Sequence, residues 1–201
     1  MRGWPMEKSA YRNEKWIIHD LAHDFELLDC WELNLSPTVT ENSFFDFFDL
    51  MINFDLTRIN PIVTCLLKFR FALGRMMKWD GPESWGTIPN SHEKSIKERL
   101  PLEAADINRA HQLKVATGVM ADFKPVYVLH NEGLAEISNS TIYALLHMGL
   151  TRENKMVLGV HVKFRGVMSK AYMASIKPFR HILVYPVWLN AMQTAWNEHS
   201  K

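Results

Sequence analysis

Residues 124–165 read KPVYVLHNEGLAEISNSTIYALLHMGLTRENKMVLGVHVKFR, and this segment determines the fold class. Apolar and polar residues alternate with a period of two in four runs: PVYVLH, GLAEIS, TIYALLHMG and KMVLGVHVKFR. This period is typical of β-strands with one buried face. The connections at 131–133, 139–140 and 152–154 are only two or three residues long, which forces neighbouring strands to run antiparallel. The segment therefore predicts an antiparallel sheet of four strands.

Helical patterns and one more strand flank this block. On its C-terminal side, apolar residues from 172 to 196 recur at helical spacing, but Pro178 and Pro186 should interrupt the helix. On its N-terminal side, FELLDCWEL (25–33) predicts a strand, and FFDFFDLMINF (44–54) predicts a helix after a turn. A second helix is expected from Pro61 to Met77.

The predicted order is one strand, two helices, four strands and a long helix. It indicates an α+β fold in which a curved antiparallel sheet grips the proline-interrupted C-terminal helix. A sheet that curls around a helix leaves space between the two, and apolar spaces of this kind commonly hold ligands.

Length and composition indicate one globular domain. The chain has 201 residues, 47% hydrophobic and 22% charged, with a net charge of +1. We expect a mobile arm at 1–15 and a single domain at 16–201. The balanced charge gives no reason to expect nucleic acid or an anionic membrane as a partner. We expect Cys30 and Cys65 to be reduced, and no secretory signal or membrane span, so a cytoplasmic location is predicted.

The charges are unevenly distributed along the chain. The segment from Asp20 to Asp55 contains nine acidic residues and no Lys or Arg. The segment from Arg152 to Arg180 contains seven basic residues and one acidic residue. The two segments could simply lie close together and compensate each other. Alternatively, five basic residues could form a pocket mouth for an anionic group: Lys163, Arg165, Lys170, Lys177 and Arg180.

Short motifs of nucleotide binding and hydrolysis are missing. The chain contains no GxGxxG, GxxxxGK[ST], GxSxG or HExxH sequence, so no cofactor is predicted. His19 and His23 would share one face of a helical turn beside Asp20 and Asp24, as metal ligands can. No third His or Cys stands at a matching position, so we predict no metal site.

The strand block carries the best candidates for chemistry. Tyr143 and His147 share one face of their strand, and Glu136 lies on a neighbouring strand. If both faces pointed to the concave side, Glu136 and His147 could form a carboxylate–imidazole pair for acid–base catalysis or ligand orientation, with the Tyr143 hydroxyl beside it. The other reading is a structural polar pair, or residues facing solvent. His161 shares one face of the last predicted strand with Lys163 and Arg165, so we expect it to face solvent.

Several blocks of the chain resemble a known family. AEISNSTIYALLHMG and YMASIKPFRHILVYP, with FELLDCWEL, LGRMMKWDG and SIKERLP, resemble the bacterial domain-of-unknown-function family 2867, from about Asp24 to the C-terminus. The resemblance implies a fold similar to the START-like, polyketide-cyclase-like helix-grip superfamily, whose members hold apolar molecules and in some cases cyclise or dehydrate them. It also implies roles for four positions, Glu136, Asn139, Thr141 and His147. Tyr143 stands where a second histidine is often expected.

These observations lead to three functional hypotheses. The first is binding of a small apolar or amphipathic molecule between sheet and C-terminal helix. In this hypothesis Glu136, Tyr143 and His147 orient the ligand, and Lys177 and Arg180 lie near the mouth. The second is a cyclase- or dehydratase-like enzyme using His147 and Glu136. The third is an accessory module that docks an oxidoreductase partner through the acidic surface of residues 20–55.

Overall fold

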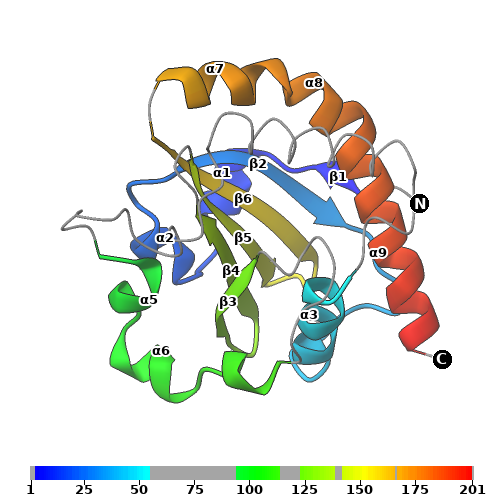
Figure 1. The fold of residues 1–201 in the computed structure, drawn as a ribbon. Helices are drawn as coiled ribbons and strands as arrows, with labels where there is room; N and C mark the ends of the chain where they lie inside the picture. Colours follow the sequence, from blue (N-terminus) through cyan, green and yellow to red (C-terminus); the bar gives the residue numbers. More distant parts are fainter. Residues whose placement is uncertain (1–2, 55–93, 114–122, 139–141, 166, 201) are drawn as a thin grey trace.

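The computed structural model describes residues 3–54, 94–113, 123–138, 142–165 and 167–200. Its centre is a curved, six-stranded antiparallel sheet with the strand order β1-β2-β6-β5-β4-β3 (Figure 1). In the described chain the two edge strands, β1 and β3, do not pair with each other, so the sheet is open. Helices flank both of its faces, which confirms the predicted α+β class.

The four predicted strands form a continuous meander, in which each strand pairs with the next one along the chain. They are β3 (Lys124–Val128), β4 (Glu132–Ser138), β5 (Ile142–Leu150) and β6 (Met156–Phe164). The register sets Leu134 opposite His147 and Leu145 opposite His161. The short connections thus produce the antiparallel pairing that the sequence predicts.

Two N-terminal strands extend this meander beyond β6. The predicted strand β2 (Glu26–Leu33) pairs with β6, with an irregularity between Leu27 and Asp29. Beyond it, the two-residue β1 (Trp4–Pro5) pairs with the end of β2. The short helix α1 (Lys8–Arg12) follows, and its Tyr11 is completely buried. Part of the segment predicted to be a mobile arm is therefore packed against the domain.

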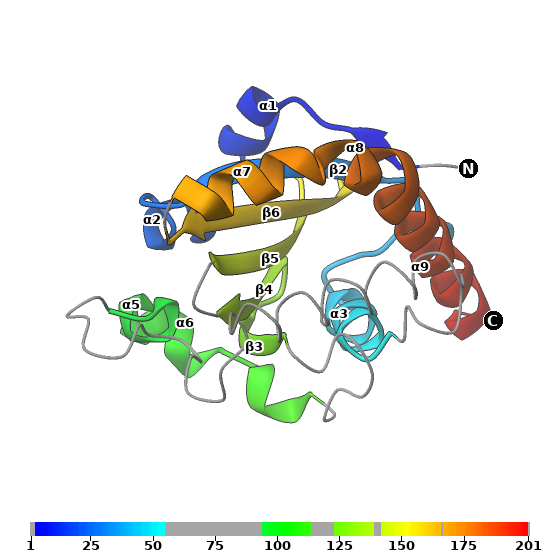
Figure 2. The ribbon, with the colours of Figure 1, turned by 45° about the horizontal axis from the view of Figure 1, so that its top comes forward.

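The sheet has two faces with different covers, which Figures 1 and 2 show from two directions. The Tyr11 face carries Glu132, Leu134, Glu136, Tyr143, Leu145, His147, Gly159 and His161. It is covered by α1, α2 (Ile18–Leu21) and α5 (Ile96–Arg99). Figure 2 shows α1 clearly separated from α3, which lies on the opposite face.

The second face, here the α9 face, carries mainly apolar side chains: Trp31, Leu33, Ala135, Leu146, Met148 and Leu158. Its described covers are α3 (Phe44–Ile52), α7 (Val167–Ser175), α8 (Lys177–Phe179), the π-helical turn η4 (Arg180–Val184) and α9 (Tyr185–His199). Trp188, Leu189, Met192 and Trp196 of α9 are all buried against this face or against α3.

The C-terminal helix is interrupted where the sequence predicts. Pro178 lies in α8, and Pro186 lies in the first turn of α9, directly after η4. A proline cannot donate to the carbonyl four residues earlier and clashes with it, so a wider π turn before Pro186 relieves the clash. The turn directs Arg180 and His181 toward the sheet, as their contacts with Asp29 of β2 show.

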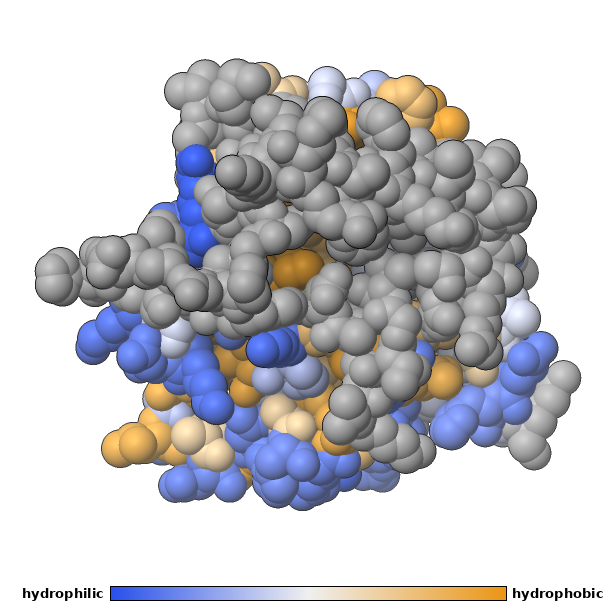
Figure 3. Space-filling model, in the orientation of Figure 1, coloured by the Kyte–Doolittle hydropathy of each residue, from blue (hydrophilic) through white to orange (hydrophobic). Residues whose placement is uncertain are grey.

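The remaining described elements lie along the β3 edge. After α5 come α6 (Leu102–Asp106) and the short turn η2 (Ala110–Gln112), and hydrophilic residues predominate over this edge (Figure 3). Cys30 is free and buried, as predicted. The helix predicted at 61–77 and Cys65 lie outside the described residues. No helix in the described part of the chain has the length and apolar character needed to cross a membrane.

Candidate functional site

A chain of buried polar side chains crosses the Tyr11 face. The Tyr11 hydroxyl lies 2.6 Å from Nδ1 of His147 and 3.0 Å from Nε2 of His161. On its other side, His147 Nε2 lies 3.2 Å from Oε2 of Glu132. Tyr127 donates its hydroxyl to the same carboxylate at 2.9 Å. Exposed fractions of at most 5% place Tyr11, His147, Glu132 and His161 inside the molecule.

Donors and acceptors in this network can be assigned consistently. Glu132 also accepts the backbone N–H of Ile17 at 2.8 Å, so its two oxygens are used as acceptors. If His147 carries its proton on Nε2, it donates to Glu132 and accepts the Tyr11 hydroxyl on Nδ1. His161 then donates from Nε2 to the Tyr11 oxygen. All three hydrogen bonds are satisfied with both imidazoles neutral.

Burial sets the protonation of His161 and Tyr11. It lowers the pKa of His161 to about 3, with His147 and His19 acting in the same direction. It also raises the pKa of Tyr11 well above its usual value, and the nearby Glu132 charge adds to that effect. A neutral imidazole and a protonated phenol are therefore the stable forms at neutral pH, which agrees with the hydrogen-bond assignment.

The predicted pairing of Glu136 with His147 is not found. Glu136 instead accepts a hydrogen bond from the Tyr143 hydroxyl, which also accepts the backbone N–H of Ile96 at 3.2 Å. Glu132 and Glu136 are the two diagonal neighbours of His147 across the β4–β5 pair, because Leu134 lies directly opposite. Glu132 also accepts hydrogen bonds from Tyr127 and Ile17, whereas Glu136 accepts one from Tyr143. Burial raises the pKa of Glu136, although the Tyr143 hydrogen bond opposes this.

The prediction that His161 faces solvent is wrong, because α1 covers this part of β6 and places Tyr11 over it. Tyr11 and Glu132 were both missed in the sequence. Tyr11 lies in a segment without a clear period. Glu132 lies within the connection predicted at 131–133, whereas in the structure it is the first residue of β4 and continues the alternation of Leu134 and Glu136. Asn139 and Thr141, implied by the family resemblance, lie outside the described residues.

The two histidines considered as metal ligands have separate surroundings. His19 packs edge-on against the Tyr11 ring, with a centroid distance of 5.5 Å, and burial lowers its pKa. His23 is exposed and its Nδ1 lies 3.0 Å from the Asp20 carbonyl oxygen. Among the described residues, no group of three or more His, Cys, Asp or Glu side chains is placed to hold a metal ion.

A second buried polar cluster lies on the α9 face, around Asp29. This carboxylate accepts the Tyr185 hydroxyl at 2.8 Å, lies 2.8 Å from His181 Nε2, and forms an ion pair with Arg180 at 3.1 Å. Asp29 is almost fully buried. Trp31, two residues along β2, packs its ring against His181 and Tyr185 at centroid distances of 5.6 and 5.1 Å. We call this group, with Trp188, the Asp29 cluster.

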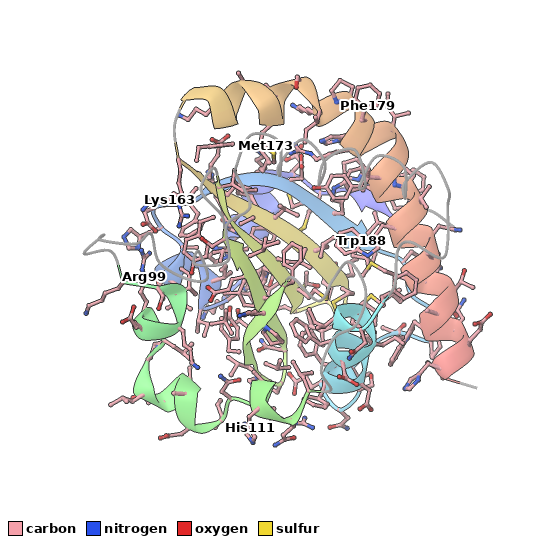
Figure 4. All side chains as sticks on the ribbon, viewed as in Figure 1. Arg99, His111, Lys163, Met173, Phe179 and Trp188 are labelled. Atoms are coloured by element: carbon pink, nitrogen blue, oxygen red, sulfur yellow. The ribbon has the colours of Figure 1, made fainter. Side chains whose placement is uncertain are left out.

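Several N–H groups in the Asp29 cluster have no hydrogen-bond partner among the residues that the structure describes. They are Nε1 of Trp31, Nε1 of Trp188, and Nε and Nη2 of Arg180, the last of which pairs with Asp29 by charge without a directed hydrogen bond. Figure 4 shows Trp188 on the side of α9 that faces the sheet, whereas Phe179 points outward from α8. Buried donors without a partner are rare in folded proteins.

The acidic and basic segments compensate each other, as the simpler interpretation predicts. Asp24 pairs with Lys163 at 2.8 Å and with Arg99 at 2.6 Å, and Figure 4 shows these two cations at the same end of the sheet. Although burial acts to raise it, hydrogen bonds from Arg99 and Lys163 hold the pKa of Asp24 well below its usual range. Arg180 pairs with Asp29, while Lys177 is exposed.

An open pocket of about 250 Å³ lies at the β1–β2 edge, and its lining includes no residue of either buried cluster. Its charged lining residues, Glu32 and Lys155, pair with each other at 3.5 Å. The exposed Trp4 forms part of the wall. Because the two charged side chains pair with each other, they offer a ligand less than the unpartnered N–H groups of the Asp29 cluster do.

Comparisons with known proteins identify a family but no activity. The sequence model of a family described as "Protein of unknown function (DUF2867)" matches residues 21–187, which are 167 of the 201 residues. Neither the curated proteins nor the solved structures gave a match. The two buried clusters are therefore the features that indicate a function.

Proposed function

This chain belongs to the DUF2867 family of proteins of unknown function, and from its geometry we propose that it binds a small apolar or amphipathic molecule on the α9 face. The ligand would lie against the sheet beside η4 and the start of α9. The proposal retains the helix-grip likeness and the cytoplasmic location expected from the sequence.

One observation carries this proposal: the unpartnered N–H groups of Trp31, Trp188 and Arg180 belong to one cluster. Leaving a buried donor without a partner costs about 1–3 kcal/mol. A ligand that accepts hydrogen bonds from these N–H groups would remove several such costs at one site. Polar groups of this kind set into an apolar surface are also what orients ligands in small-molecule sites.

The proposal changes which residues orient the ligand. Glu136, Tyr143 and His147 lie on the Tyr11 face, opposite α9, and are bound to other partners. The Asp29 cluster takes their place. Arg180 remains a ligand-binding candidate, and the exposed Lys177 lies close by in the chain, as expected of a residue near a mouth.

Hydrogen exchange of the wild-type protein tests the proposal without any substitution. We choose the neutral probe N-phenyl-1-naphthylamine, whose fluorescence rises in apolar surroundings. We expect saturable binding, together with slower amide exchange in residues 180–192. The segment 8–21, which covers the opposite face, serves as the internal control and should not change. Protection confined to residues 8–21, or no saturable binding, would reject this function.

A second candidate, acid–base catalysis, is favoured by the contact between His147 and Glu132. Here Glu132 replaces the predicted Glu136, and Tyr11 holds the other imidazole nitrogen. A substrate could reach His147 only if α1 and α2 moved away, because the side chain is completely buried. The docking of an oxidoreductase partner through the acidic segment stays a prediction.

Diethyl pyrocarbonate distinguishes these two candidates, because it modifies a histidine only when the imidazole is neutral and solvent reaches it. Under the binding proposal, His147 in the native protein should resist modification at pH 7, while the exposed His111 and His130 react. Mass spectrometry of peptides gives the extent at each histidine. Modification of His147 as fast as that of His130 would favour catalysis.

A further inference from the structure

The unpartnered groups of the Asp29 cluster also restrict the chemistry of the ligand. Resting on the proposed function, we infer that the ligand is a flat apolar molecule with a neutral hydrogen-bond acceptor, such as a ketone or ester carbonyl. The N–H groups of Trp31, Trp188 and Arg180 would donate to this acceptor. Three steps lead to that class of molecule.

The first step concerns hydrogen-bond direction. An indole nitrogen and a guanidinium are donors only, so every unpartnered atom of the cluster requires an acceptor. The side chains of Trp31 and Trp188 are each 6% exposed, which leaves little contact with solvent to satisfy them. A ligand group that only donates would leave these N–H groups without an acceptor. It would also add one more buried donor that lacks an acceptor.

The second step concerns charge. Asp29 already neutralises Arg180 through the ion pair at 3.1 Å and receives two further contacts, from Tyr185 and His181. An anionic ligand would bring a second negative charge beside the buried Asp29 carboxylate and would lose its own hydration. A cation would lie beside the Arg180 guanidinium and would bring no acceptor for the unpartnered N–H groups. A neutral acceptor avoids both costs.

The third step concerns shape. The rings of Trp31 and Tyr185 lie 5.1 Å apart, and those of Tyr185 and Trp188 lie 6.4 Å apart with an interplanar angle of 24°. Aromatic surfaces of this kind favour flat apolar partners, which they contact over a large area. Trp31 and Trp188 supply both aromatic rings and N–H donors, so an aromatic ketone matches both features.

Three naphthalenes of nearly equal shape test this inference. They are 2-acetylnaphthalene, which carries a ketone; 2-ethylnaphthalene, which replaces it with hydrocarbon; and 2-naphthoate, which carries a charge. Their affinities for the wild-type protein would be measured by competition with N-phenyl-1-naphthylamine. We expect the ketone to bind about tenfold more tightly than the hydrocarbon, the ratio for about one hydrogen bond. It should also bind more tightly than the carboxylate.

Two tryptophans of α9 give a matched pair of variants. Trp188→Phe removes an unpartnered indole N–H, whereas Trp196→Phe removes one that already donates to the Pro37 carbonyl at 2.8 Å. We expect Trp188→Phe to lower the ketone-to-hydrocarbon ratio about threefold to tenfold. Trp196→Phe should leave the ratio unchanged. Trp31→Phe repeats the test on the sheet if Trp188→Phe does not fold.

Each outcome separates the inference from the function on which it rests. If none of the three compounds binds, the proposed function fails. If ketone and hydrocarbon bind equally well, a ligand site exists but the inference about its chemistry is rejected. If 2-naphthoate binds most tightly, the ligand is an anion and not a neutral acceptor. If Trp188→Phe and Trp196→Phe lower the ketone-to-hydrocarbon ratio equally, the unpartnered indole N–H groups are not the donors.

Discussion

Tyr11 holds the polar network of the Tyr11 face together. Its hydroxyl lies between His147 and His161, at 2.6 and 3.0 Å. Tyr11→Phe keeps the packed ring but leaves one nitrogen of each buried imidazole without a partner. With about 1–3 kcal/mol for each unpaired group, we expect the free energy of unfolding to fall by about 2–4 kcal/mol. Urea denaturation followed by circular dichroism measures this change.

A control on the same helix separates the network from the helix itself. Ser9→Ala also removes a hydroxyl from α1, but this one is exposed and bonds only to the neighbouring Glu7. We expect a change of less than about 0.5 kcal/mol. If Tyr11→Phe proves equally mild, the network does not stabilise the packing of α1 on the sheet.

Two glycines of the sheet each lie directly under a different covering helix. A Cβ at Gly159 would lie 2.6 Å from Cζ of Tyr11, and a Cβ at Gly133 would lie 2.6 Å from the ring of Phe48 in α3. Real side chains do not approach so closely, so each alanine must displace its own covering element. Such overpacking typically costs about 1–3 kcal/mol.

We therefore expect two different responses to the same chemical change. Gly159→Ala should speed amide exchange in the segment 8–21 and leave residues 44–52 unchanged, whereas Gly133→Ala should do the reverse. Hydrogen exchange with mass spectrometry resolves both segments. Loss of protection in both segments with either variant would show that the two covers open together.

The strands and the interruption of the C-terminal helix could be predicted from the sequence, because both depend on local sequence patterns. The two-residue alternation predicts β2 and the meander β3–β6, and it correctly places Tyr143, Leu145 and His147 on one face. Pro178 and Pro186 act through their own backbone, so the interruption of the C-terminal helix is also predictable.

The candidate sites depend on packing between distant segments, which local periods do not encode. Glu132 and Glu136 are equivalent as diagonal neighbours of His147 until Tyr127 and the Ile17 amide select Glu132. His161 is buried only because α1 crosses the sheet 150 residues from it in sequence. The Asp29 cluster likewise joins β2 to η4 across about 150 residues.

The buried histidines make the stability of the whole molecule depend on pH. Burial lowers the pKa of His161 to about 3, so below its ordinary pKa of 6.5 the unfolded chain binds a proton that the folded chain does not. Stability is therefore lost as the pH falls from about 6.5 toward 3. His161 alone should remove about 2 kcal/mol of unfolding free energy between pH 7 and pH 5. The lowered pKa of His19 acts with the same sign.

A variant isolates this effect from other groups that titrate in the same range. The raised pKa of Glu136 acts with the opposite sign, because the folded state takes up that proton more readily as the pH falls. His161→Gln removes the titration but keeps an amide N–H that can donate to the Tyr11 oxygen. Between pH 7 and pH 5 the variant should lose about 2 kcal/mol less unfolding free energy than the wild type, because Glu136 contributes equally to both. Parallel pH profiles would mean that His161 takes up its proton in the folded state, and hence that α1 does not shield it from solvent.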